Sequence, residues 1–163
     1  MKKLVIAIDV GDTLLDRSMG KIVRMESGRL TYPTFPCAIE TMEAIKRAGH
    51  KMVIISKIDP GAEAKVTEYL VHHQIRPDLV DYEDLVFCYD RAEKGPIAKR
   101  LGVDVIIDDR VQVHNSMAAS DIPHRILFLG GHDDRDIYTL TTSVLEARSW
   151  MNVFVYINNL SQQ

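Results

Sequence analysis

The chain has 163 residues and a formal net charge of −3, and 46% of its residues are hydrophobic and 26% are charged. This length predicts one domain, residues 1–163, because a chain of this size buries roughly 70% of the surface that its unfolded form exposes. The acidic balance excludes broad, sequence-independent binding of nucleic acids, and the two distant cysteines, Cys37 and Cys88, indicate buried, reduced thiols in a cytoplasmic protein.

The first expected strand, Leu4–Asp9, is apolar up to its last residue, which is typical of a strand buried on both faces. Its apolar run is too short for a signal peptide or a membrane span, so we expect no membrane association. Four further buried strands are expected at Met52–Ile55, Leu85–Tyr89, Val103–Ile107 and Ile126–Leu129. Apolar spacing and end signals predict helices at Ala38–Ala48, Asp59–His73, Lys94–Leu101, Val111–Ala119 and Thr141–Tyr156.

A small β-hairpin is predicted after the first strand, because Lys21–Arg24 and Arg29–Tyr32 flank the turn residues Glu26-Ser27-Gly28. Five buried strands that alternate with helices predict an α/β protein with a five-stranded parallel sheet and helices on both faces. The expected fold is therefore three-layered and Rossmann-like, with the hairpin as a flap. Sheets of this kind bind ligands beyond the carboxyl ends of their strands.

Acidic and polar side chains follow the expected strands at that edge. Asp9 ends the first strand, Ser56 the second, and Asp108 with Asp109 the fourth. Three carboxylates close together repel one another, and a hard divalent cation such as Mg²⁺ offsets that repulsion. Ser56 adds a hydroxyl group, and Lys94, at the start of a helix, adds a positive charge. A cation, a lysine and a hydroxyl around one carboxylate can bind a phosphoryl group and place Asp9 to attack it as a nucleophile.

Four motifs occur in a fixed order along the chain. The first is an apolar strand that ends in Asp9-Val10-Gly11-Asp12-Thr13-Leu14, and the second is the strand Val53-Ile54-Ile55-Ser56. The third is Lys94, shortly before the fourth, which is the strand Val105-Ile106-Ile107-Asp108-Asp109. In order and spacing these motifs resemble those of the haloacid dehalogenase (HAD) superfamily of phosphohydrolases, and the resemblance covers nearly the whole chain.

The resemblance implies a role for each matching residue. Asp9 would form an aspartyl-phosphate and contact Mg²⁺, Asp108 would ligate the ion, and Asp109 would be a ligand or a partner of one. The backbone carbonyl of Gly11 could supply another ligand, since that contact needs no side chain. The phosphate-binding residues that the resemblance implies are Thr13, which would orient the loop, Ser56 and Lys94.

The resemblance is incomplete at Gly11, because the family's phosphatases have an aspartate there that protonates the leaving oxygen and then activates water. General acid–base help of this kind is worth about 10²- to 10⁴-fold in rate. One hypothesis is therefore a slow phosphohydrolase, with Asp12 as the candidate substitute for the missing acid. The alternative is a catalytically impaired protein of the same fold that binds phosphate and metal. A receiver-like phosphoacceptor domain uses similar groups, but its paired acids precede its lysine, and here they follow it.

The intervals between the motifs are too short for a cap domain. Only the hairpin and one helix lie between Thr13 and Ser56, and only one helix and one strand lie between Ser56 and Lys94. Capless members of the family resemble enzymes that act on large substrates or that close the site with a neighbouring subunit. We therefore expect a phosphorylated substrate, with its identity and the oligomeric state of the chain left open.

Two histidine-containing clusters have simpler interpretations. The neighbours His72-His73 point to different faces of a helix, so solvated side chains are favoured over a metal site. His132–Asp136 is interpreted as a solvated acidic loop, with a contact to substrate or a second ion as the alternative. Trp150, Met151 and Phe154 are expected in the core or in a subunit contact.

Overall fold

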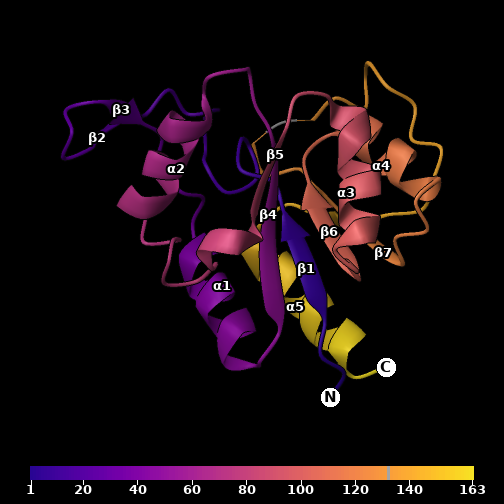
Figure 1. Ribbon diagram of the computed structural model, residues 1–163. Helices are drawn as coiled ribbons and strands as arrows, with labels where there is room; N and C mark the ends of the chain where they lie inside the picture. Colours follow the sequence, from indigo (N-terminus) through magenta and orange to yellow (C-terminus); the bar gives the residue numbers. More distant parts are fainter. Residues whose placement is uncertain (132) are drawn as a thin grey trace.

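A parallel sheet with helices on both faces forms the body of the protein (Figure 1). The computed structural model describes residues 1–131 and 133–163. The expected fold class is confirmed, but the sheet has six strands rather than five, in the order β5-β4-β1-β6-β7-β8. These strands are β1 Val5–Ile8, β4 Lys51–Lys57, β5 Leu85–Cys88, β6 Val105–Asp108, β7 His124–Phe128 and β8 Leu145–Ala147.

Strand β1 lies between β4 and β6 and pairs in parallel with both. Its residues Ile6, Ala7 and Ile8 are fully buried, which explains the continuous apolar run in the sequence. The chain adds β4 and β5 on one side of β1 and then β6, β7 and β8 on the other. The strand order therefore reverses between β1 and β6, where open α/β sheets leave a crevice at the carboxyl ends of their strands.

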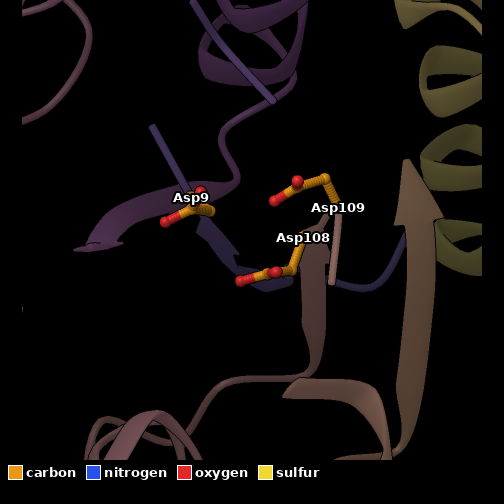
Figure 2. A group of neighbouring side chains, drawn as sticks. All are labelled: Asp9, Asp108 and Asp109. Atoms are coloured by element: carbon orange, nitrogen blue, oxygen red, sulfur yellow. The ribbon is translucent and has the colours of Figure 1, made fainter. Parts of the chain in front are cut away.

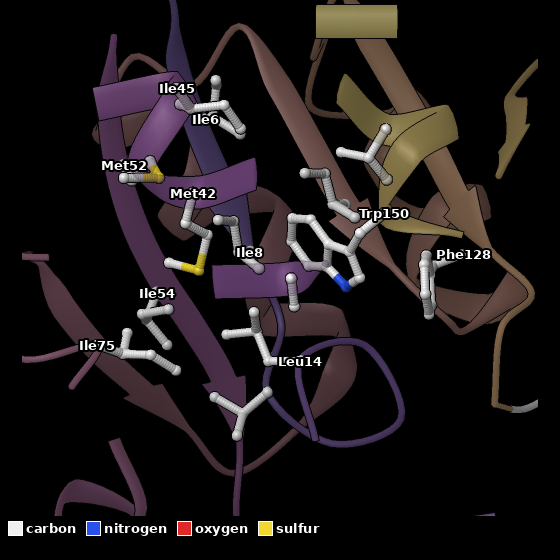
Figure 3. Packing of buried hydrophobic residues seen from close by; sticks show 14 of the residues in the cluster. Ile6, Ile8, Leu14, Met42, Ile45, Met52, Ile54, Ile75, Phe128 and Trp150 are labelled. Atoms are coloured by element: carbon white, nitrogen blue, oxygen red, sulfur yellow. The ribbon is translucent and has the colours of Figure 1, made fainter. Parts of the chain in front are cut away.

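The two faces of the sheet are covered by different helices (Figure 1). One face packs against α1 Ala38–Arg47, α2 Glu63–His72 and α5 Trp150–Ser161. This layer holds the larger core, in which Ile6, Ile8 and Ile54 of the sheet lie near Met42 of α1 and Trp150 of α5 (Figure 3). The other face packs against α3 Lys94–Arg100 and α4 Val111–Ala118.

The predicted hairpin is confirmed. Strands β2 Val23–Arg24 and β3 Leu30–Thr31 pair in antiparallel fashion. The turn between them contacts α2, because the Ser27 hydroxyl donates a hydrogen bond to Glu68 and Arg29 Nη1 lies 2.9 Å from Glu68 Oε2. The hairpin is thus held beside the carboxyl edge of the sheet. In the part of the chain that is described, no helix is both long and apolar enough to cross a membrane.

The largest difference from the sequence prediction lies between residues 141 and 156, where one helix was expected. The chain instead forms β8, which pairs with β7, and then α5, which begins after Ser149. The Ser149 side chain caps the helix by accepting a hydrogen bond from the Asn152 amide. Of the residues expected in the core or in a subunit contact, Trp150 is fully buried, whereas Met151 is 52% exposed. The apolar spacing of residues 141–156 therefore belongs to a short strand and a helix in succession.

Smaller corrections concern helix starts and cysteines. Helix α2 begins at Glu63 rather than at Asp59. Both cysteines are unpaired thiols, but only Cys88 is buried, and Cys37 is exposed before α1. Two short 3₁₀ helices, η1 Tyr82–Asp84 and η2 Arg91–Glu93, flank β5.

Candidate active site at the carboxyl end of the sheet

Three buried aspartates meet where β1 and β6 end (Figure 2). Asp9 follows β1, Asp108 is the last residue of β6, and Asp109 comes next in the chain. The two strands are in register, with Ile8 opposite Ile107, and the Asp9 amide donates a hydrogen bond of 3.0 Å to the Ile107 carbonyl. One carboxylate oxygen from each aspartate lies within 4.8 Å of the others. The sheet therefore brings these acids together, as the sequence predicts.

The Lys94 ammonium group bridges two of the three acids. Its Nζ lies 2.7 Å from Asp9 Oδ1 and 2.6 Å from Asp108 Oδ2, and the residue is only 2% exposed. Lys94 reaches this point because it begins α3, which starts beyond the carboxyl edge of the sheet. Burial by itself would lower the pKa of Lys94, but the attraction of Asp108 and Asp9 outweighs it and raises that pKa. Lys94 therefore remains a fixed positive charge.

Two of the acids, Asp9 and Asp109, are costly to ionise. Burial raises the pKa of Asp9, with Lys94 opposing that effect and Asp108 adding to it. Burial, together with Asp108 and Asp9, raises the pKa of Asp109 to about 9. Among the described residues, Asp109 Oδ2 is buried and accepts no hydrogen bond, although Arg110 Nε lies 3.0 Å away as an ion-pair partner. Ionising all three acids at once would therefore place more negative charge here than Lys94 and Arg110 offset in place.

This donor set fits a magnesium ion. The available ligand atoms are carboxylate oxygens, which Mg²⁺ prefers, and they converge without a histidine or cysteine in the group. The surplus of buried negative charge and the unsatisfied Asp109 oxygen are both features that a divalent cation would correct.

A tight turn follows Asp9 and fixes the rest of the first motif. The amides of Leu14 and Leu15 both donate to the Val10 carbonyl, and Asp12 has a left-handed φ of 57°. The indole of Trp150 donates a 2.9 Å hydrogen bond to the Thr13 carbonyl, which ties this turn to α5. Thr13 is completely buried, and its hydroxyl oxygen has no hydrogen-bond partner among the described residues.

Arg17 lies directly over the glycine that departs from the family pattern. A Cβ atom built on Gly11 would be 3.1 Å from the guanidinium carbon of Arg17. The same guanidinium forms an ion pair of 2.5 Å with Asp12, whose carboxylate also lies 3.7 Å from Arg110 Nη2. The Asp12 carboxylate is thus engaged by arginines, and the space beside Gly11 holds a positive group.

A cavity of about 410 Å³ opens at this edge of the sheet. The predicted site residues that line it are Asp9, Gly11, Ser56, Lys94 and Asp109. Asp108 is fully buried and contacts the site through Lys94, and Asp12 and Thr13 are buried residues that do not line the cavity. The lining also contains basic residues that sequence reasoning missed, namely Arg17, Lys57, Lys65, Arg91 and Arg110. Charged residues on loops and helix starts are normally solvated, so the sequence gives little reason to place these five in a site. The one available signal is that most of them lie near the motifs.

The remaining candidates fall outside the cavity lining. His73 Nε2 forms a 2.8 Å hydrogen bond with the Tyr32 carbonyl. The loop expected to be solvated contains a buried acid, because Asp134 is 2% exposed and accepts a hydrogen bond from the Val111 amide at the start of α4. His132, which belonged to the same predicted loop, lies outside the described residues.

Comparisons in sequence found no matching family model and no matching curated protein. Solved structures do match. A D,D-heptose 1,7-bisphosphate phosphatase from B. bronchiseptica, complexed with magnesium and phosphate, has a TM-score of 0.70 at 14% identity, over 98% of this chain and 99% of that one. A HAD-superfamily hydrolase from Ehrlichia chaffeensis has a TM-score of 0.63 at 14% identity, over 98% of each chain.

A third match is a 3-deoxy-D-manno-octulosonate 8-phosphate phosphatase from Moraxella catarrhalis, in complex with a magnesium ion, a phosphate ion and a KDO molecule. It has a TM-score of 0.52 at 17% identity, over 98% of this chain and 88% of that one. The chain therefore has the fold of HAD-superfamily hydrolases, and the resemblance first carried by four short motifs is confirmed at the level of the fold.

Proposed function

We propose that this chain is a Mg²⁺-dependent phosphohydrolase that acts through an aspartyl-phosphate on Asp9. One observation carries the proposal: Asp9, Asp108 and Asp109 converge beside Lys94 in a cavity at the point where the strand order reverses. A carboxylate placed next to a fixed ammonium group and a hard-cation site is equipped to bind a phosphoryl group and to attack it. The fold shared with magnesium-bound phosphatases supports this reading.

Each residue of the site takes a distinct role in the proposal. Asp9 is the nucleophile, and Lys94 binds the phosphoryl oxygens while neutralising Asp9 and Asp108. The Ser56 hydroxyl, at the cavity wall, donates to another phosphoryl oxygen. The residues that would hold Mg²⁺ are Asp9, Asp108 and Asp109, together with the Gly11 carbonyl. Such an ion, when bound, draws charge from the phosphoryl oxygens.

Residues behind the lining support the loop that carries Asp9. Thr13 orients the phosphate-binding turn, through its buried backbone and its hydrogen bond from Trp150. Asp12 is assigned to the positioning of Arg17, since its carboxylate lies 2.5 Å from that guanidinium and is not part of the cavity wall. We further propose that residues 1–163 act as one HAD-like core without a cap domain, with the hairpin as the local lid.

One feature favours a second candidate, a phosphate- and metal-binding protein with impaired turnover. Gly11 has no side chain that could act as an acid, and the guanidinium of Arg17 lies where such a side chain would begin. The loss of an acid–base group costs about 10²- to 10⁴-fold in rate. Such a protein would bind Mg²⁺ and inorganic phosphate but release no product.

The two candidates separate in one assay. The full chain is incubated with Mg²⁺ and an activated aryl phosphate, beside Asp9→Asn and the surface control Asp133→Asn. A phosphohydrolase gives turnover that Asp9→Asn abolishes and Asp133→Asn retains. An inert wild type whose Gly11→Asp variant gains activity establishes the binding protein instead. If neither variant nor wild type turns over and no Mg²⁺ binds, the site assignment is wrong.

A further inference from the structure

The cavity beside Asp9 is built to hold negative charge. Six basic side chains line it, against three carboxylates, and no imidazole is found among the described residues of its wall. The basic residues are Arg17, Lys57, Lys65, Arg91, Lys94 and Arg110. A general acid must have a pKa near the working pH, and guanidinium groups do not release protons in proteins. Among the lysines, Lys57 and Lys94 are held in ion pairs with carboxylates of the site, and the hydrogen bond with Tyr69 raises the pKa of Lys65. This wall can therefore stabilise a departing anion far better than it can protonate one.

None of the three carboxyl groups in the wall remains available as an acid. Asp9 is the proposed nucleophile, and Asp109 belongs to the proposed magnesium cluster. Asp59 has a side chain that is 87% exposed and an ion pair of 2.8 Å with Lys57. The hydrogen bond from Lys57 lowers the pKa of Asp59, so this carboxyl group is ionised at neutral pH.

Arg17 is the basic residue of the wall that is nearest to Asp9 in sequence. Its guanidinium lies 3.1 Å from a Cβ built on Gly11, two residues after Asp9, and both Gly11 and Arg17 face the cavity that Asp9 lines. The 2.5 Å ion pair with Asp12 holds it there. With a side chain that is 46% exposed, the guanidinium keeps one side open toward the cavity.

We propose that this site cleaves phosphoric anhydrides, and that Arg17 stabilises the anion that leaves. The proposal rests on the phosphohydrolase function argued above and specifies its substrate class. An anhydride is a phosphoryl group joined through oxygen to a carboxylic acid or to another phosphate. Its leaving group departs as a stable anion and needs no proton, whereas the alkoxide of a sugar or glycerol phosphate does. A wall dominated by cations suits the anionic leaving group better than the alkoxide.

The first step of the reaction needs no proton donor. The Asp9 carboxylate forms a bond to phosphorus while the bond from phosphorus to the bridging oxygen breaks, and that electron pair leaves with the oxygen as a carboxylate or phosphate ion beside Arg17. Water then attacks the phosphorus of the aspartyl-phosphate. The Asp9 carboxylate is regenerated, inorganic phosphate keeps the water oxygen and one proton, and the other proton passes to solvent.

The test compares three substrates on the full chain with Mg²⁺. Phosphate release is measured from acetyl phosphate, from ADP and from glycerol 3-phosphate. The first two arms separate a carboxylic from a phosphate leaving group, and the third is the alkyl ester. We expect kcat/KM for one of the anhydrides to exceed that for the ester, and Asp9→Asn to abolish both. Arg17→Gln should lower the anhydride value by about 10-fold or more and the ester value less, and Arg17→Lys should restore part of the loss.

Gly11→Asp supplies the converse test. An added carboxyl group should raise turnover of the ester by about 10²-fold and change the anhydride value little, and Gly11→Ala controls for the added Cβ. Arg135→Gln, on a surface ion pair outside the cavity, should behave as wild type. If Arg17→Gln lowers both substrate classes by the same factor, or if the ester is the better substrate, this inference fails while Asp9-dependent turnover preserves the proposed function. If no phosphate compound shows Asp9-dependent turnover, both fail.

Discussion

Asp109 after β6 and Asp133 in the loop after β7 carry the same carboxyl group, yet their surroundings shift their pKa values in opposite directions. Burial and the neighbouring Asp108 and Asp9 raise the pKa of Asp109 to about 9. Hydrogen bonds from Arg135 lower the pKa of Asp133 to about 2. Those hydrogen bonds form a two-pronged contact, with Arg135 Nε 2.9 Å from Oδ1 and Nη2 2.6 Å from Oδ2.

The two groups differ in how fully their charges are offset within the protein. The Asp133 carboxylate is partly exposed and paired with the Arg135 guanidinium, so water and this arginine together offset its charge. The cluster of Asp9, Asp108 and Asp109 is buried, and its closest cation, Lys94, faces two of the three acids. Buried charge that is only partly offset destabilises a fold. Such a cluster at the crevice of the sheet is therefore typical of a site that binds a ligand.

The largest expected contrast between the two groups is in turnover. Asp108→Asn should lower the Mg²⁺-dependent rate by about 10²- to 10³-fold, because it removes a charge from the point where the phosphoryl group is stabilised. Asp133→Asn should stay within about twofold, since surface pairs contribute little. Steady-state phosphate release, with Mg²⁺ binding followed by calorimetry, measures both. Equal rates in the two variants would mean that the buried cluster has no part in the chemistry.

The second contrast is in stability. Lys94→Gln should lower the free energy of unfolding by about 3 kcal/mol in EDTA, because it leaves Asp9 and Asp108 buried without their cation. Saturating Mg²⁺ should restore part of that loss, since the ion takes over the neutralising role. Urea denaturation with and without Mg²⁺ provides the measurement. A loss below about 1 kcal/mol in EDTA would show that Lys94 behaves like a surface residue.

The buried cluster could be predicted from sequence because it depends on regular geometry. Parallel strands bring their carboxyl ends to one edge, so an apolar run that ends in Asp9 and another that ends in Asp108 are enough to place both acids there. Lys94 needs only the additional fact that α3 begins at the same edge. The site acids, Lys94 and the sheet that carries them therefore followed from periodicity and motif order.

Arg17 could not be predicted in this way. Its contact with Asp12 and its place over Gly11 depend on a left-handed residue at Asp12 and on two amides that share the Val10 carbonyl. No period in the sequence encodes such a turn, because an aspartate can adopt either hand there. The prediction for residues 141–156 was wrong for a different reason. Strand β8 has only 3 residues, too few to display a period of two, and the true start of α5 is marked by its N-cap, Ser149.

The third contrast is the effect of neutralising one acid in each group. In the metal-free protein, the folded state takes up a proton at Asp109 that the unfolded state lacks between pH 4 and pH 9, so stability falls as pH rises through this window. Asp109→Asn removes that penalty. Its Tm in EDTA at pH 8 should rise by about 2–4 °C for each kcal/mol recovered.

With Mg²⁺ the order should reverse, because the wild type gains a ligand that the Asp109→Asn variant binds more weakly. Thermal melts at several pH values, with EDTA and with Mg²⁺, measure both effects. If the variant is less stable than wild type in EDTA at every pH, then Asp109 is stabilised by contacts within the protein and carries no surplus charge.

The smallest expected effect belongs to the exposed pair, where the sign of the pH dependence is opposite. The lowered pKa of Asp133 contributes stability that is present above pH 4 and is lost as pH falls through about 2. Arg135→Gln should remove it, at a cost of at most about 1 kcal/mol at pH 7, because the pair is solvent-screened. High salt should shrink the difference further, since a Debye length of about 3 Å at 1 M screens exposed charges. Urea melts at pH 7 and pH 3, at low and high salt, test this. If Arg135→Gln lowered the free energy of unfolding by more than Lys94→Gln does, and salt did not reduce that loss, the exposed pair would contribute more to stability than the buried cluster.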